Sequence, residues 1–172
     1  DGSIYEEAYD VLVLSPGARP VIPDIPGVDG SRVFALRTVE DAYAIKDFVD
    51  AEGVRSAVVV GAGFIGLETA ENLRDLGMEV TVVQRGTQVM KSVDPDMAAI
   101  IHNRLRDAGV RLLLSTHIEG VEEDGDTVGS AVRVLTAEHD PISCDMVVLA
   151  VGVVPDSSLA KDAGLELGAR GS

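Results

Sequence analysis

Short apolar runs alternate with longer segments in which apolar residues recur at helical spacing, and this alternation predicts an α/β fold. Glycine closes each helical segment, at Gly77 and at Gly109. In chain order, strands are expected at 57–60, 80–83 and 110–114, with helices at 64–76 and 95–108 between them. A strand, a crossover helix and a second strand form a βαβ unit, so these strands are expected to form a parallel sheet.

The first part of the chain predicts two more strands and a helix. Residues 10–14 (DVLVL) are apolar after an acidic start and are stopped by serine, proline and glycine, which is typical of a short buried strand. Residues 32–36 predict another strand, and Thr38 is expected to cap a helix that ends at Gly53. Four closely spaced prolines exclude a helix near residues 17–30 and predict a stiff domain junction there.

The pattern changes after the third strand. Residues 118–123 and 128–135 are expected to pair as an antiparallel hairpin or meander around a turn at 124–126, in place of another crossover helix. Residues 146–151 predict a buried fourth strand of the parallel sheet, and residues 158–163 predict a helical turn. The predicted fold class is therefore α/β, a Rossmann-like parallel sheet with crossover helices and an inserted antiparallel element.

Charge narrows the partners that this fold would bind. The 172 residues include 29 acidic and 14 basic side chains, a net charge of -15, which repels nucleic acid and anionic lipid. No apolar run approaches the roughly 20 residues that span a bilayer. The single cysteine, Cys144, excludes an internal disulfide. We expect a cytoplasmic protein with no nucleic-acid or membrane partner.

A glycine turn joins the strand at 57–60 to the helix at 64–76, and it matches the pattern G-x-G-x-x-G. Between a buried strand and a helix, this pattern predicts a dinucleotide site: the first glycine allows the tight turn, the second lets the pyrophosphate approach the backbone, and the third lets helix and strand pack closely. The positive end of the helix then meets the phosphate charge. The residues of the turn are Gly61, Ala62, Gly63, Phe64, Ile65 and Gly66.

The residues after the second strand bear on the choice between NADH and NADPH. An NAD site usually has a carboxylate there for the ribose 2′-hydroxyl, but this chain has Gln84 and Arg85. Gln84 can bond a hydroxyl without repelling a 2′-phosphate, and Arg85 and Lys91 can bind that phosphate. The alternative is that both cations are solvated loop charges.

The remaining reactive side chains have structural interpretations. Glu68 lies in the first turn of the helix after the glycines, where a carboxylate gains from the helix dipole. Cys144 has no partner thiol, and the three histidines show no metal-ligand spacing. We therefore expect no metal site. The histidines are His102, His117 and His139.

Several stretches together resemble the FAD-dependent pyridine nucleotide-disulfide oxidoreductases. The resemblance covers nearly the whole chain. The stretches are YDVLVLSPGARP at 9–20, IPGVDG at 25–30, VVVGAGFIGLETAENLRDLGMEVTVV at 58–83, SVDPDM at 92–97 and DMVVLAVGVVPD at 145–156. The loop Ser15, Pro16, Gly17, Ala18 is similar to the coenzyme A-disulfide reductase and NADH oxidase branch of that family.

The resemblance implies that the chain is part of a longer flavoprotein. Residues 1–30 would be the end of an FAD domain and its linker, residues 31–154 the NAD(P)H-binding domain, and residues 155–172 the return segment. The loop Ser15 to Ala18 would flank the FAD. The redox cysteine and the dimerisation domain of the family would lie outside this chain, so no catalytic residue is assigned within it. The full-length protein would be a homodimer.

The resemblance also assigns roles to single residues. Phe64 and Ile65 match positions that flank the nicotinamide, and Glu68 matches a glutamate that faces the nicotinamide and flavin. Arg85 and Lys91 match two basic positions that grip the 2′-phosphate in NADPH-using members. Val151 and Gly152 match the strand end that closes over the cofactor.

The function implied is transfer of hydride from NADPH or NADH to FAD, and of electrons from FAD to a disulfide, a coenzyme A-disulfide or persulfide, a peroxide or oxygen. Two alternatives remain. One is a stand-alone nucleotide-binding redox sensor, which would have no use for the segment at 9–20. The other is a fragment of a simple dehydrogenase, which the antiparallel element argues against.

Overall fold

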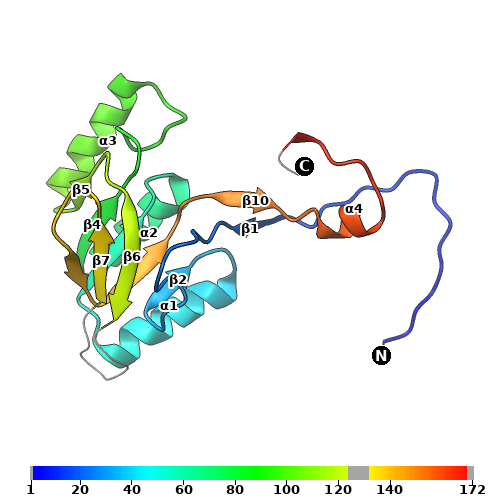
Figure 1. The fold of residues 1–172 in the computed structure, drawn as a ribbon, viewed down its shortest axis with the longest axis horizontal. Helices are drawn as coiled ribbons and strands as arrows, with labels where there is room; N and C mark the ends of the chain where they lie inside the picture. Colours follow the sequence, from blue (N-terminus) through cyan, green and yellow to red (C-terminus); the bar gives the residue numbers. More distant parts are fainter. Residues whose placement is uncertain (1, 124–131, 170–172) are drawn as a thin grey trace. The chain divides into compact units, whose positions relative to one another are not determined.

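A parallel sheet of five strands forms the centre of residues Pro20–Val153 in the computed structural model, which describes residues 2–123 and 132–169. The strand order is β2-β9-β3-β4-β5 (Figure 1). In chain order these strands are β2 (Val33–Ala35), β3 (Ser56–Val60), β4 (Glu79–Val83), β5 (Arg111–Leu113) and β9 (Met146–Leu149). The predicted fold class is confirmed. The strand predicted at 32–36, whose place in the sheet was not predicted, forms an edge strand beside β9.

Three helices cover one face of this sheet (Figure 1). They are α1 (Val39–Glu52), α2 (Phe64–Asp75) and α3 (Pro95–Asp107), close to the predicted segments. Successive side chains of a strand point to opposite faces, and in β3 it is Ala57 and Val59 that pack in the cluster with the helices. Ala70 and Leu73 of α2 belong to the same cluster. The alternation in β3 therefore places the glycine-turn helix directly on the sheet.

A smaller antiparallel sheet covers the opposite face. It consists of β6 (Ile118–Glu123), β7 (Val132–Thr136) and β8 (Ile142–Cys144), in that order. Its valines pack against Val58 and Val60, the residues of β3 that point to this second face of the sheet. The antiparallel pairing of β6 with β7 was predicted, but β8 was not, because three residues give too short a pattern. The expected turn at 124–126 and the expected start of the second strand lie outside the described residues.

The second compact unit consists of Asp1–Arg19 and Val154–Ser172. At its boundary, β1 (Ala18–Pro20) pairs with β10 (Val153–Pro155), and α4 (Ser158–Asp162) follows as the predicted helical turn. The sequence missed β1, because prolines make poor strand residues except at an edge. It also merged residues 146–151 into one strand, whereas β9 ends at Leu149 and β10 begins four residues later.

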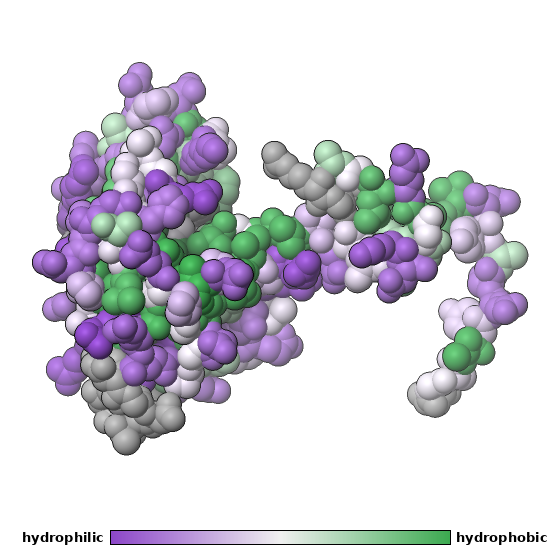
Figure 2. Space-filling model, in the orientation of Figure 1, coloured by the Kyte–Doolittle hydropathy of each residue, from purple (hydrophilic) through white to green (hydrophobic). Residues whose placement is uncertain are grey.

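The strand predicted at 10–14 is wrong for this chain. These residues do not form a strand, and Val11 and Val13 are each 82% exposed. The prediction fails because a buried strand needs neighbours on both sides, and no described strand pairs with this segment. Figure 2 shows apolar residues of this unit at its surface.

Within the described ranges, none of the helices has both the length and the apolar character needed to cross a membrane.

Candidate dinucleotide-binding site

The glycine turn follows β3 at the edge where all five parallel strands end. The strands that come after β3 in the chain lie on both sides of it, with β4 and β5 on one side and β9 on the other. Loops that leave in opposite directions create a crevice outside the strand ends, and this switch point is where open α/β sheets bind ligands. The turn therefore lies where a ligand of this fold is expected.

Gly61 is held between the two neighbouring strands. Its N–H donates to the carbonyl of Val83 at 2.8 Å, and its φ of +104° lies in the region that favours glycine. A β-carbon here would lie 2.3 Å from the carbonyl oxygen of Ala150. The backbone after β9 thus packs directly against the turn, and no side chain fits between them.

Gly66 and Gly63, the other two glycines of the turn, differ in whether the protein's own packing requires a glycine. A β-carbon on Gly66 would lie 1.9 Å from the carbonyl oxygen of Gly61, so the close approach of α2 to the turn excludes any side chain. A β-carbon on Gly63 would meet nothing within 4 Å, and the φ of Gly63 is -83°. The protein's own packing therefore does not require glycine at position 63. A ligand that needs the space beside the backbone would require it.

Gly63 is also the N-cap residue of α2, which has no side-chain cap. The first N–H groups of a helix have no acceptor within the helix, and the helix dipole places a partial positive charge at this end. A pyrophosphate is an acceptor of the right charge for such an end. The absence of a side-chain cap and the open space at Gly63 are both explained by a pyrophosphate bound at this helix end.

The loop after β4 is bonded to the turn at two points. The side-chain amide of Gln84 accepts through Oε1 from the N–H of Ala62 at 3.1 Å, and donates through Nε2 to the carbonyl of Gln88 at 3.3 Å. The N–H of Met90 donates to the carbonyl of Ala62 at 2.8 Å. Gln84 thus lies beside the turn as predicted, but its amide already bonds protein atoms.

Arg85 and Lys91 are exposed in this same loop. Neither side chain makes a hydrogen bond or ion pair with any residue in the described ranges. Lys91 directly follows Met90, and the bond from the N–H of Met90 to the carbonyl of Ala62 holds this part of the loop close to the turn in space. Both cations are therefore available to an anion at this edge of the sheet.

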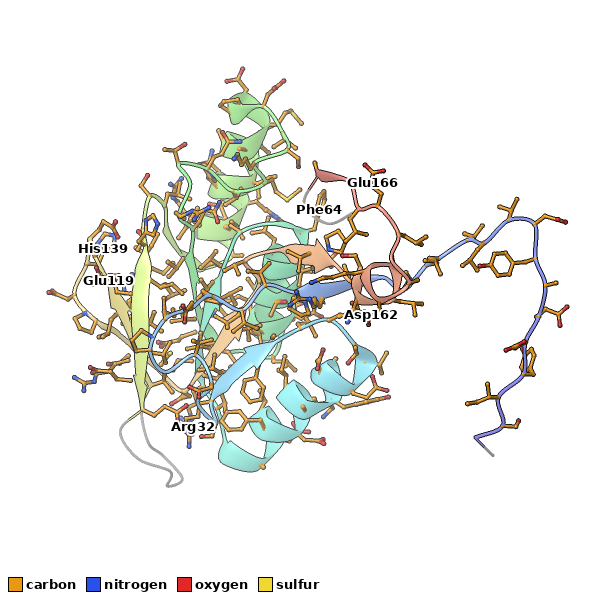
Figure 3. All side chains as sticks on the ribbon, turned by 45° about the vertical axis from the view of Figure 1, so that its right-hand side comes forward. Arg32, Phe64, Glu119, His139, Asp162 and Glu166 are labelled. Carbon is orange, nitrogen blue, oxygen red and sulfur yellow. The ribbon has the colours of Figure 1, made fainter. Side chains whose placement is uncertain are left out.

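The nicotinamide-side residues predicted from the resemblance share the exposed surface of α2. Phe64 is the first residue of α2 and is 67% exposed (Figure 3), and Glu68 lies one turn later on the same face. Both border a hollow of about 490 Å³ between α2 and α3. Glu68 and Ile65 also border a hollow of about 540 Å³ between α1 and α2. These residues are accessible to a ligand, and none is buried in the core.

Val151 and Gly152 follow β9 at the same edge of the sheet. Both are exposed, and Gly152 has a φ of +124°. The N–H of Ala150 donates to the carbonyl of Val60 at 2.7 Å, which sets this loop beside the glycine turn. The sequence did not single out Ala150 or Met90, because their contributions are backbone contacts that carry no side-chain signal.

The predicted FAD-flank residues belong to the other compact unit. Gly17 has a φ of +85°, and its carbonyl accepts from the N–H of Asp156 at 2.9 Å. Ala18 begins β1, while Ser15 and Pro16 are exposed. This loop is therefore joined to the segment after β10 within its own unit.

The cysteine is buried, and the rings of His102 and His139 contact protein atoms. Burial raises the pKa of the Cys144 thiol to about 12, so it stays protonated and unreactive at neutral pH. The Nε2 atom of His102 accepts from the N–H of Val89 at 3.1 Å, and burial lowers the pKa of this imidazole. The Nε2 atom of His139 lies 3.1 Å from the Thr116 hydroxyl. Within the described ranges, no three metal-ligating side chains form a group that could hold an ion.

Comparison with known proteins places this geometry in a family. Residues 1–172 match the family described as pyridine nucleotide-disulphide oxidoreductase. The chain belongs to this family, as the resemblance predicted.

The chain is similar to named members of the coenzyme A-disulfide reductase and NADH oxidase branch. It is 42% identical over 169 residues to an NADH oxidase of Methanocaldococcus jannaschii, covering 98% of this chain and 37% of that protein. It is 33% identical over 167 residues to a coenzyme A disulfide reductase of Staphylococcus haemolyticus, covering 97% of this chain and 36% of that protein. The chain thus spans little more than a third of each of these relatives.

A solved structure gives the same result for the fold. The crystal structure of reduced Bacillus anthracis CoADR-RHD superimposes with a TM-score of 0.88 at 46% identity. The match covers 98% of this chain and 29% of that one. The arrangement of β3, the glycine turn and α2 is therefore that of a family member.

Proposed function

We propose that this chain is the NAD(P)H-binding part of a flavoprotein oxidoreductase. The observation that carries the proposal is the N-terminus of α2, where Gly63 leaves the helix uncapped and leaves open space that the protein's packing does not require. The pyrophosphate of NADH or NADPH fits this end in charge and in hydrogen-bonding character. Membership of the family, and the name NADH oxidase of a relative, support the same ligand.

Each predicted binding residue has a role in this proposal. Gly61 and Gly66 shape the turn, Gly63 admits the pyrophosphate, and the N–H groups at the start of α2 bind it. Phe64, Ile65 and Glu68 border the nicotinamide from the exposed side of α2, with Val151 and Gly152 on the other side of the turn. Arg85 and Lys91 lie in the loop that follows the ribose position, and they support binding of a 2′-phosphate. Ala62 and Gln84 are the other two predicted binding residues, and they shape the turn and its neighbouring loop.

In the full-length protein, a nicotinamide held here would supply a hydride to FAD, and FAD would pass electrons to a disulfide, a coenzyme A-disulfide or persulfide, a peroxide or oxygen. This chain contributes the binding and orientation of the electron donor. No residue of the chain is assigned to the chemistry itself. The one thiol, Cys144, is buried with a raised pKa, and so does not serve as the redox cysteine.

We propose that residues 31–154 form the NAD(P)H-binding domain and that residues 1–30 and 155–172 belong to the FAD domain. The compact unit Pro20–Val153 supports the second of these boundaries, whereas at the first boundary residues 20–30 pack with this unit. The exposed valines at 11 and 13 also support it, because an apolar segment of this kind needs neighbouring strands to bury it. A stand-alone nucleotide sensor would have no such requirement. The family and the charge of -15 further support a cytoplasmic homodimer without nucleic-acid or membrane partners.

Calorimetry on the purified chain tests the proposal. NADH or NADPH should bind with a one-to-one stoichiometry, and the protein should carry no yellow flavin. Adenosine, which lacks the pyrophosphate, serves as the control ligand and should bind far more weakly. Tight FAD binding without affinity for either reduced nicotinamide dinucleotide would refute the proposal.

The role of the loop cations has a separate test. Arg85→Glu should weaken NADPH binding at least tenfold while changing NADH binding little, because a charge-assisted contact with a phosphate is worth roughly 1.5 to 3 kcal/mol. The matched control is Arg111→Glu, the same charge change at an exposed position at the start of β5, the opposite edge of the sheet. Equal losses for the two dinucleotides would show that Arg85 is a solvated loop charge.

A further inference from the structure

The side chain of Gln84 joins two segments that are separate in the sequence. On one side its Oε1 accepts from the N–H of Ala62, in the middle of the glycine turn. On the other side its Nε2 donates to the carbonyl of Gln88, in the loop that carries Arg85. The backbone of Gln84 is also held, with its N–H donating to Leu113 and its carbonyl accepting from Thr116. The residue is thus fixed at both its backbone and its amide.

Only a carboxamide satisfies both side-chain contacts. The Ala62 contact needs an acceptor and the Gln88 contact needs a donor, so the amide has a single orientation that fits. A glutamate could still accept from Ala62, but its second oxygen would face the carbonyl of Gln88 without a proton between them. An aliphatic residue would leave the N–H of the fully buried Ala62 without this acceptor.

We propose that Gln84 is a positioning residue that holds the pyrophosphate turn and the neighbouring loop in register, and that it does not select between NADH and NADPH by reading the ribose. This inference rests on the proposed function of the site. The turn binds the part that the two dinucleotides share, whereas the 2′ position is the part in which they differ. A residue that acts through the turn affects both ligands alike. A residue that reads the 2′-hydroxyl affects them differently.

The loop after β4 supplies a matched control. Gln88 is a second glutamine, and its Nε2 donates to the carbonyl of Val93 at 2.9 Å. This bond lies within the loop and does not involve the glycine turn. Gln88→Ala removes it but keeps the backbone carbonyl that Gln84 uses. The pair of variants therefore separates the link to the turn from the internal order of the loop.

The experiment measures the Kd of NADH and of NADPH for the wild-type chain, Gln84→Ala and Gln88→Ala, together with the free energy of unfolding of each. Gln84→Ala should raise both Kd values about tenfold, the change expected for the loss of one hydrogen bond. The ratio of the NADH Kd to the NADPH Kd should not change. Gln88→Ala should leave both Kd values unchanged. Gln84→Met, which fills the same space without hydrogen bonds, repeats the test if the alanine variant does not fold.

Two results would overturn the inference. A loss confined to NADH would mean that Gln84 reads the 2′-hydroxyl directly. A lower free energy of unfolding with both Kd values unchanged would mean that its role is only structural. Wild-type protein that binds neither dinucleotide would instead refute the proposed function, so the two failures are distinguishable.

Discussion

Helices α1 and α2 both begin at the carboxyl edge of the parallel sheet, but their first turns are satisfied differently. The N-cap of α1 is Thr38, whose side chain accepts from the N–H of Asp41, while the Asp41 carboxylate accepts in return from Thr38. The N-cap of α2 is Gly63, which has no side chain to offer. A helix that closes its own N-terminus needs nothing more, whereas a helix left open at the mouth of a crevice can bind an anion.

The largest expected effect is the loss of stability when Gly66, where α2 packs against the turn, is given a side chain. Gly66→Val should destabilise the protein by roughly 3 kcal/mol or more, because the new β-carbon would overlap the carbonyl of Gly61. Chemical denaturation measures the change. Gly63→Val is the matched control and should cost far less, about 1 kcal/mol for a poorer N-cap residue, since its β-carbon meets no atom. Equal losses for the two variants would contradict the distinction between these glycines.

Giving α2 its own cap should separate binding from stability. In Gly63→Asp the new carboxylate can accept from the first N–H groups of α2, and aspartate is preferred over glycine at an N-cap by a few tenths of a kcal/mol. The same carboxylate fills the phosphate position and repels it. We expect unchanged or greater stability by denaturation, and NADH binding weakened by about 100-fold or more in calorimetry, since facing like charges cost several kcal/mol. NADH binding at wild-type strength would show that the pyrophosphate does not bind at this helix end.

Removing the cap of α1 should lower the stability of the protein without weakening NADH binding. Thr38→Ala should lower the free energy of unfolding by about 1 kcal/mol, the usual value of such a cap. NADH affinity should not change, because the proposed binding residues lie around α2 and not at the first turn of α1. A loss of NADH affinity in folded Thr38→Ala would mean that the two helix ends are coupled.

The smallest expected effect is the pH dependence of the α1 cap. The backbone N–H of Thr38, above all, and that of Arg37 hold the pKa of Asp41 below its ordinary value of 3.8. A carboxylate with a lowered pKa in the folded state stabilises the protein above its ordinary pKa, and that contribution is lost as the pH falls below 3.8 toward the folded pKa. Asp41→Asn should therefore have a flatter dependence of unfolding free energy on pH in the acid range. An unchanged pH dependence of the unfolding free energy would mean that groups other than Asp41 cause the loss of stability in acid.

The sequence predicted the capped helix and the glycine turn well because both depend on local residue types. Thr38 and Gly53 bound α1 as expected, and the three motif glycines stand where the turn needs them. The sequence failed where structure depends on distant partners. Residues 10–14 read as a strand although no described strand pairs with them.

The same limit applied to the site. The sequence could place Gln84 at the end of β4, but it could not show that the amide would bond both Ala62 and Gln88. It also gave no sign of the contact between Gly61 and Ala150, which are far apart in the chain and meet only through their backbones. Interactions of this kind follow from sheet order, which local patterns do not specify.

The position of β9 has a consequence for how the protein is made. This strand lies between β2 and β3, although it is the last of the five parallel strands in the chain. While the ribosome is still producing residues 61–145, the β3 edge that β9 will cover is unpaired, and the carbonyl that packs on Gly61 does not yet exist. Pairing over such a long separation is slow and leaves an apolar strand open to association with other chains. The nucleotide site therefore cannot form until β9 and Ala150 have been made, and nascent chains arrested before residue 146 should depend on chaperones.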